Sequence, residues 1–74
     1  MNSLDFTLRG DHIALDALLK ATGLASSGGA AKAMIVAGQV QVDGQVELRR
    51  GCKLRAGQRV LAGGSLVQVL APGQ

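Results

Sequence analysis

A chain of 74 residues with a net charge of +3, one cysteine, one histidine and one aromatic residue leaves room for a single domain, residues 1–74. Cys52 alone excludes an internal disulfide, and together with His12 it makes no zinc site, so we expect no metal and no cofactor. The chain shows neither a signal-peptide pattern nor an apolar run near the ~20 residues that cross a bilayer, which predicts a cytoplasmic protein.

The positive charge is concentrated in the second part of the chain. Residues 1–24 hold two cations against three acids, whereas residues 25–74 hold six cations against Asp43 and Glu47. This asymmetry indicates a polyanionic partner, either a nucleic acid or an acidic membrane surface. An ordinary solvated face is the alternative, because such a net charge is common among small soluble domains.

The first elements in chain order are a short strand and a helix. Phe6 and Leu8 alternate with polar neighbours up to Gly10, which predicts a brief edge strand. A stripe at helical spacing follows, made of Leu15, Leu18 and Leu19. Asp11 is the candidate N-cap and Gly23 the C-cap signal, so we expect this helix over residues 13–22.

A second helix is expected between two capping signals. Ser26 and Ser27 are candidate N-caps, and Gly38 can adopt the left-handed conformation that ends a helix. The apolar stripe consists of Ala30, Ala31, Met34 and Ile35. Lys32 falls off this stripe and should face outward.

After Gly38 the apolar period changes to two, which indicates strands. One face of the first strand carries Val40 and Val42, and the other carries Gln39 and Gln41. Asp43-Gly44 is a strong hairpin signal, and the return strand should begin with Val46 and Leu48.

The remaining strands alternate in the same way. Cys52 and Leu54 should point inward, which places Lys53 and Arg55 together on the outer face. Residues 59–62 and 66–70 are predicted strands joined by a glycine pair at 63–64. The fold class is therefore α+β, with two short helices packed on a small, mainly antiparallel sheet.

With these elements placed, residues 15–60 resemble the S4 domain, an RNA-binding module named after a protein of the small ribosomal subunit. The matching residues are Leu15-Asp16, Leu18-Leu19, Gly23, Ser27, Ala31-Lys32, Ile35, and the stretches 38–44 and 57–60. The chain looks most similar to the small stand-alone bacterial members of the YbcJ type, on the basis of Ser27-Gly28, Ala31-Lys32, residues 47–50 and Cys52-Lys53. The resemblance implies an αL-type motif and a non-enzymatic, RNA-binding role.

The chain departs from this family at the start of the second helix. The family commonly places an arginine directly after the serine, and here that position is Gly28, followed by Gly29. Either the basic residues have moved to 49–59, or backbone N–H groups at Ser27, Gly28 and Gly29 contact phosphate at the positive end of the helix. Ordinary capping by the serine is the plainer explanation.

The expected RNA-binding residues are Lys32, Gln39, Gln41, Arg49, Arg50, Lys53 and Arg55. Four of these cations lie in residues 49–55, here called the basic arm, with Glu47 as the only nearby acid. Such a face repels itself unless an anion binds. The two glutamines could reach sugar hydroxyls, although exposed glutamines usually face water. Phe6, as the only aromatic residue, cannot supply the stacking platforms of single-strand binders, which favours structured RNA.

Catalysis is the weaker interpretation. His12 lies near Asp11 and Asp16, but general acid–base chemistry also needs a pocket and groups that orient a substrate. Cys52 alternates into the core, where a free cysteine behaves as a small hydrophobe. We therefore expect no catalytic residue and no enzyme.

These observations predict a monomeric protein that binds structured RNA, such as ribosomal RNA, through the basic arm, and that has no membrane partner. The resemblance implies a role in ribosome assembly or translation. The alternative is a protein-interaction adaptor that docks on the acidic surface of a partner.

Overall fold

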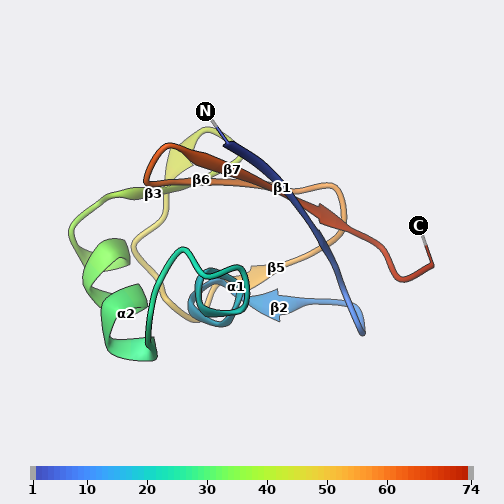
Figure 1. The fold of residues 1–74 in the computed structure, drawn as a ribbon, viewed down its shortest axis with the longest axis horizontal. Helices are drawn as coiled ribbons and strands as arrows, with labels where there is room; N and C mark the ends of the chain where they lie inside the picture. Colours follow the sequence, from blue (N-terminus) through green and yellow to red (C-terminus); the bar gives the residue numbers. More distant parts are fainter. Residues whose placement is uncertain (1, 74) are drawn as a thin grey trace.

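The structure is a computed structural model that describes residues 2–73, and its elements form two layers (Figure 1). One layer is a five-stranded sheet in the order β1-β7-β6-β3-β4, and the other holds both helices and the two-stranded ribbon β2-β5. The elements are β1 (Asn2–Thr7), β2 (Ile13–Ala14), α1 (Leu15–Ala21), α2 (Gly28–Val36), β3 (Val40–Val42), β4 (Gln45–Val46), β5 (Lys53–Leu54), β6 (Arg59–Ala62) and β7 (Ser65–Leu70). Neither helix is long and apolar enough to span a membrane.

The predicted α+β class, with a mainly antiparallel sheet, is confirmed. Only β1 runs parallel to its neighbour, β7, while the β3-β4, β3-β6 and β6-β7 pairs are antiparallel. The first strand lies at an edge, as predicted, but it starts earlier than the alternation of Phe6 and Leu8 suggested. The ladder to β7 begins at Asn2, opposite Ser65, and this pairing sets the length of the strand.

The hairpin turn at Asp43-Gly44 is also confirmed. Both residues have positive φ angles, 51° and 85°, which are the values that a primed turn needs and that glycine adopts without strain. The return strand, β4, ends at Val46 and is therefore shorter than predicted. Leu48 lies beyond it and is 60% exposed, so this stretch has left the sheet before the basic arm begins.

The predicted start of the first helix is wrong. Ile13 and Ala14 belong to β2, where they pair with Leu54 and Lys53, and α1 begins only at Leu15. The N-cap residue is Ala14, which makes no side-chain hydrogen bond, so Asp11 is not the cap. Pairing with β5, which lies far along the chain, holds these two residues in an extended conformation, although the local pattern placed them in the helix.

The first N–H groups of α1 are instead satisfied by the basic arm. The backbone N–H of Leu15 donates to the carbonyl oxygen of Cys52 at 2.9 Å, and that of Asp16 donates to the carbonyl oxygen of Arg50 at 3.1 Å. The next N–H, of Ala17, donates to the Asp16 carboxylate at 2.8 Å. The start of α1 and the arm therefore form one hydrogen-bonded unit.

The core lies between the two layers. Its largest fully buried side chains are Leu15, Leu18, Leu19, Ile35, Val40, Leu54, Val60, Val67 and Val69. Both predicted helical stripes face this core, and Lys32 is exposed, as expected. The inward position of Leu54, with Lys53 and Arg55 exposed on either side, confirms the predicted alternation in the arm.

The capping role of Ser27 can be tested by substitution. Its hydroxyl oxygen accepts the N–H of Ala30 at 3.1 Å, so Ser27→Ala should lower the free energy of unfolding by about 1 kcal/mol. Ser26→Ala is the matched control, because this neighbouring exposed serine is not the cap. Urea denaturation measures both variants. Equal losses in the two variants would contradict the capping role.

Candidate nucleic-acid interface

The basic arm crosses from the sheet to the helix layer. It leaves the end of the β3-β4 hairpin and enters β5, and its backbone is held against the first turn of α1. The side chains of Arg50, Lys53 and Arg55 are exposed, and within residues 2–73 none of them makes a hydrogen bond or ion pair. Three cations thus project from a fixed backbone next to the positive end of a short helix.

Arg49 differs from the other cations of the arm because it is ion-paired. Its Nε lies 3.1 Å from Oε2 of Glu47, its Nη2 lies 3.3 Å from Oε1, and its backbone N–H also donates to Oε2 at 3.1 Å. The hydrogen bond from the Arg49 side chain lowers the pKa of Glu47 to about 2, and the same contact raises the pKa of Arg49. Glu47 therefore offsets one of the four charges that the sequence assigned to the arm.

Cys52 is partly buried and packs against the core. It is a free, half-buried cysteine, and burial, together with the nearby Glu47 carboxylate, raises the pKa of its thiol. A thiol that stays protonated at neutral pH is a poor nucleophile. Residues 2–73 hold no group of three or more histidine, cysteine and acidic side chains that could bind a metal ion.

The far end of the arm is tied to the hairpin turn by a network that the sequence did not reveal. The Gln58 side chain accepts the backbone N–H of Arg55 at 2.7 Å and donates to Oδ2 of Asp43 at 3.1 Å. Oδ1 of Asp43 accepts the backbone N–H of Arg59 at 2.9 Å. These bonds use backbone groups of the two arginines, so both guanidinium groups stay available.

The start of α2 is open to solvent. Gly28 and Gly29 are exposed, and a Cβ atom added at Gly28 would meet no heavy atom within 4 Å. Asp16 and Lys20 of α1 line a shallow hollow beside Gly28. The capping hydrogen bond explains the serine at position 27. Gly28 and Gly29 leave space for an anion beside Asp16 and Lys20.

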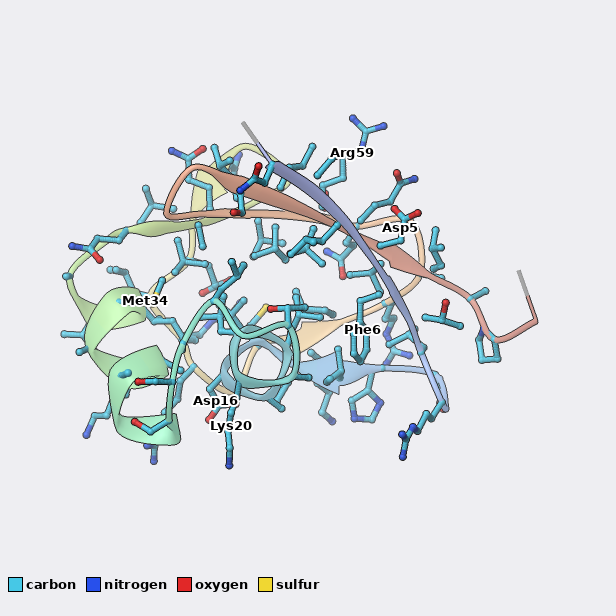
Figure 2. The ribbon with its side chains drawn as sticks, in the orientation of Figure 1. Asp5, Phe6, Asp16, Lys20, Met34 and Arg59 are labelled. Carbon is cyan, nitrogen blue, oxygen red and sulfur yellow. The ribbon has the colours of Figure 1, made fainter. Side chains whose placement is uncertain are left out.

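The remaining predicted residues lie on two different surfaces. Lys32 is exposed on α2, and Gln39 is exposed just after that helix. Gln41 lies opposite Leu61 in the sheet and lines a hollow together with Arg59. Figure 2 shows Arg59 on the side of the sheet away from the helices. The structure therefore separates Gln41 from the cations on the helix side.

Comparison with known proteins supplies the family. The family model of the S4 domain matches residues 6–70, so the chain belongs to the S4 domain family. The solution structure of YbcJ from E. coli, reported to reveal an αL motif involved in RNA binding, is similar, with 47% sequence identity and a TM-score of 0.73 over 96% of this chain and 91% of that chain. No curated protein matches the chain. The resemblance read from the sequence and the αL-type fold are confirmed.

The ion pair between Glu47 and Arg49 predicts a measurable titration. The pKa of Glu47 is about 2, below its ordinary 4.5, so the pair contributes stability above pH 4.5 that is lost as the pH falls towards 2. Arg49→Gln should return the pKa of Glu47 towards 4.5, whereas the control Arg50→Gln should leave it low. NMR titration of the Glu47 carboxyl carbon measures both. A value near 4.5 in the wild-type protein would show that the pair does not form in solution.

Proposed function

We propose that this protein binds structured RNA, such as ribosomal RNA, through the basic arm, and that it acts without catalysis in ribosome assembly or translation. The observation that supports the proposal is the set of three exposed cations, Arg50, Lys53 and Arg55, with no acidic partner within residues 2–73. Cations fixed on a rigid backbone are suited to a regular row of phosphates. Membership of the S4 domain family and the likeness to YbcJ point the same way.

The form of the RNA is inferred from what the interface lacks. The arm carries no aromatic residue, so it offers no platform on which consecutive unpaired bases could stack. Contacts to phosphates and to the shape of a helix remain, and these favour double-stranded or folded RNA. Lys32, exposed on α2, and Gln39, exposed just after that helix, would extend the contact beyond the arm. We further propose that the protein acts as a cytoplasmic monomer.

The salt dependence of binding tests the arm. If Arg50, Lys53 and Arg55 each contact one phosphate, log affinity for a hairpin RNA should fall with log salt at a slope of about −2 to −3, from roughly −0.7 to −0.9 per contact. Arg50→Ala should reduce this slope by about one unit and weaken binding to most RNAs alike. Arg59→Ala removes the same charge on the far face of the sheet, and it should leave the slope unchanged.

This experiment also separates RNA binding from the alternative, an adaptor that docks on an acidic protein. Fluorescence anisotropy with a labelled hairpin at several salt concentrations gives the slope. A slope near zero, or no binding to RNA with retained binding to an acidic protein surface, would overturn the proposal in favour of the adaptor.

Gly28→Arg tests the start of α2. Because a side chain at Gly28 meets open space, an arginine should fit, add a cation near Lys20 and strengthen RNA binding several-fold. Gly28→Gln is the control, since it adds similar bulk without charge. Affinities are compared at one salt concentration, after circular dichroism shows unchanged folds. Weaker binding by both variants would show instead that the glycine admits a phosphate close to the helix backbone.

A further inference from the structure

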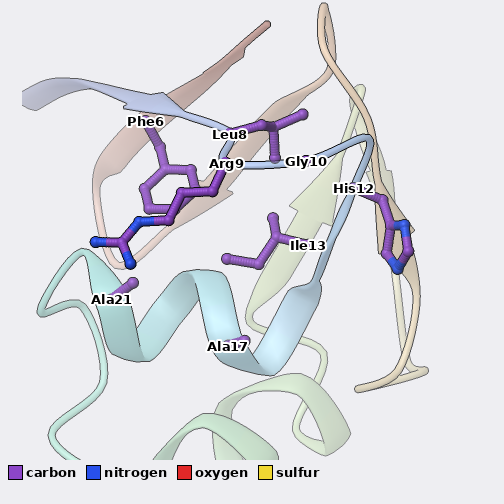
Figure 3. A pocket seen from close by; sticks show the side chains of 8 residues that line it. All are labelled: Phe6, Leu8, Arg9, Gly10, His12, Ile13, Ala17 and Ala21. Atoms are coloured by element: carbon purple, nitrogen blue, oxygen red, sulfur yellow. The ribbon is translucent and has the colours of Figure 1, made fainter. Parts of the chain in front are cut away.

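A second surface lies outside both the basic arm and the start of α2. It is a hollow of about 420 Å³ between the end of β1, the loop that follows it, and α1 (Figure 3). Its apolar lining includes Phe6, Leu8, Ile13 and Ala17, and its polar lining includes Arg9 and His12. The volume falls within the range of about 300–1,000 Å³ that is typical of sites for small ligands.

The wall of the hollow contains the one aromatic ring of the chain. Phe6 packs against the core and is only half-buried, so part of the ring faces the hollow. An aromatic face next to aliphatic side chains can hold a flat, weakly polar group such as a nucleobase. A single ring provides for one base, whereas a run of bases would need a row of rings.

The rim of the hollow is positively charged. Figure 3 shows the Arg9 side chain extended beside the Phe6 ring towards Ala21, while His12 stands on the opposite side. Within residues 2–73, the Arg9 side chain has no hydrogen bond and no ion pair, which leaves it free for a ligand. Asp11 is the acid of the same loop, and it does not line the hollow.

The hollow shares the β2-β5 ribbon with the basic arm. In the β2-β5 ribbon, Ile13 lies opposite Leu54 and Ala14 opposite Lys53. Ile13 lines the hollow, and Lys53 and Arg55 flank its partner Leu54 along the arm, so the hollow and two cations of the arm belong to the same two-stranded ribbon. An RNA strand whose phosphates are bound by these cations would therefore lie near the hollow.

We propose that the hollow binds one unpaired base of the RNA whose backbone lies on the basic arm, with the base against Phe6 and Arg9 beside it. The inference rests on the proposed function and adds a preference for RNA in which a helix is interrupted by a flipped-out nucleotide. An apolar side chain of an acidic peptide would also suit an apolar hollow with a basic rim. The base is favoured because two cations of the arm lie on the same ribbon as the hollow, where they can bind the phosphates of the strand that supplies the base.

The test uses two RNA hairpins with the same stem, one fully paired and one with a single bulged nucleotide. Stacking of one base predicts that the wild-type protein binds the bulged hairpin at least about fivefold more tightly. Phe6→Leu should abolish this preference and leave the affinity for the paired hairpin unchanged. Arg9→Gln should reduce the preference several-fold, and the control Arg59→Gln should retain it.

With 2-aminopurine as the bulged base, fluorescence should fall on binding to the wild-type protein but not to Phe6→Leu.

The outcomes separate this inference from the proposed function. Salt-dependent binding with equal affinity for both hairpins would overturn the base site and leave the arm intact, whereas failure to bind either hairpin would overturn both. An acidic peptide that occupies the hollow, in a protein with no preference for the bulge, would assign it to a protein partner. If circular dichroism shows that Phe6→Leu does not fold, Arg9→Gln decides, because its side chain is exposed.

Discussion

Two backbone hydrogen bonds, from the N–H groups of Leu15 and Asp16 to carbonyl oxygens of the basic arm, join the start of α1 to the segment that carries the cations. They satisfy donors that a helix cannot pair within itself, and they do so with a segment that comes much later in the chain. The helix start and the arm therefore keep one relative position. The backbone that carries the cations loses little further freedom when a ligand binds, and the remaining cost is that of ordering their side chains.

The rest of the arm is organised around the same contact. Leu54 anchors it in the core, and the ion pair between Glu47 and Arg49 fixes its beginning. The pair also lowers the mutual repulsion of the cations, because a carboxylate lies among them. At the other end, the side chains of Gln58 and Asp43 bind backbone groups of the arm and of β6, so the hairpin turn braces the arm. The interface is thus a short chain segment held at its start, middle and end.

The features that sequence analysis predicted correctly depend on neighbours within a few residues. The cap at Ser27 and the turn at Asp43-Gly44 are of this kind, since each is decided by its own backbone angles and nearest hydrogen bonds. The assignment of Asp11 as a cap failed because the arm, far away in sequence, took its place. The parallel pairing of β1 with β7 and the gathering of Phe6, Arg9 and His12 around one hollow likewise depend on tertiary contacts. The pair of Glu47 and Arg49 could have been found, because side chains two apart in an extended segment share one face.

The pairing of β1 with β7 also bears on the order in which the protein is made. β1 is the first described strand and β7 the last, and β1 lies at an edge with β7 as its only neighbour in the sheet. On a growing chain, β1 has no partner until all the other elements have been synthesised. Pairings so distant in sequence close late, because the intervening chain must be ordered first. The hairpin and arm can form earlier, so a nascent chain should acquire its cationic surface before the wall that contains Phe6 is in place.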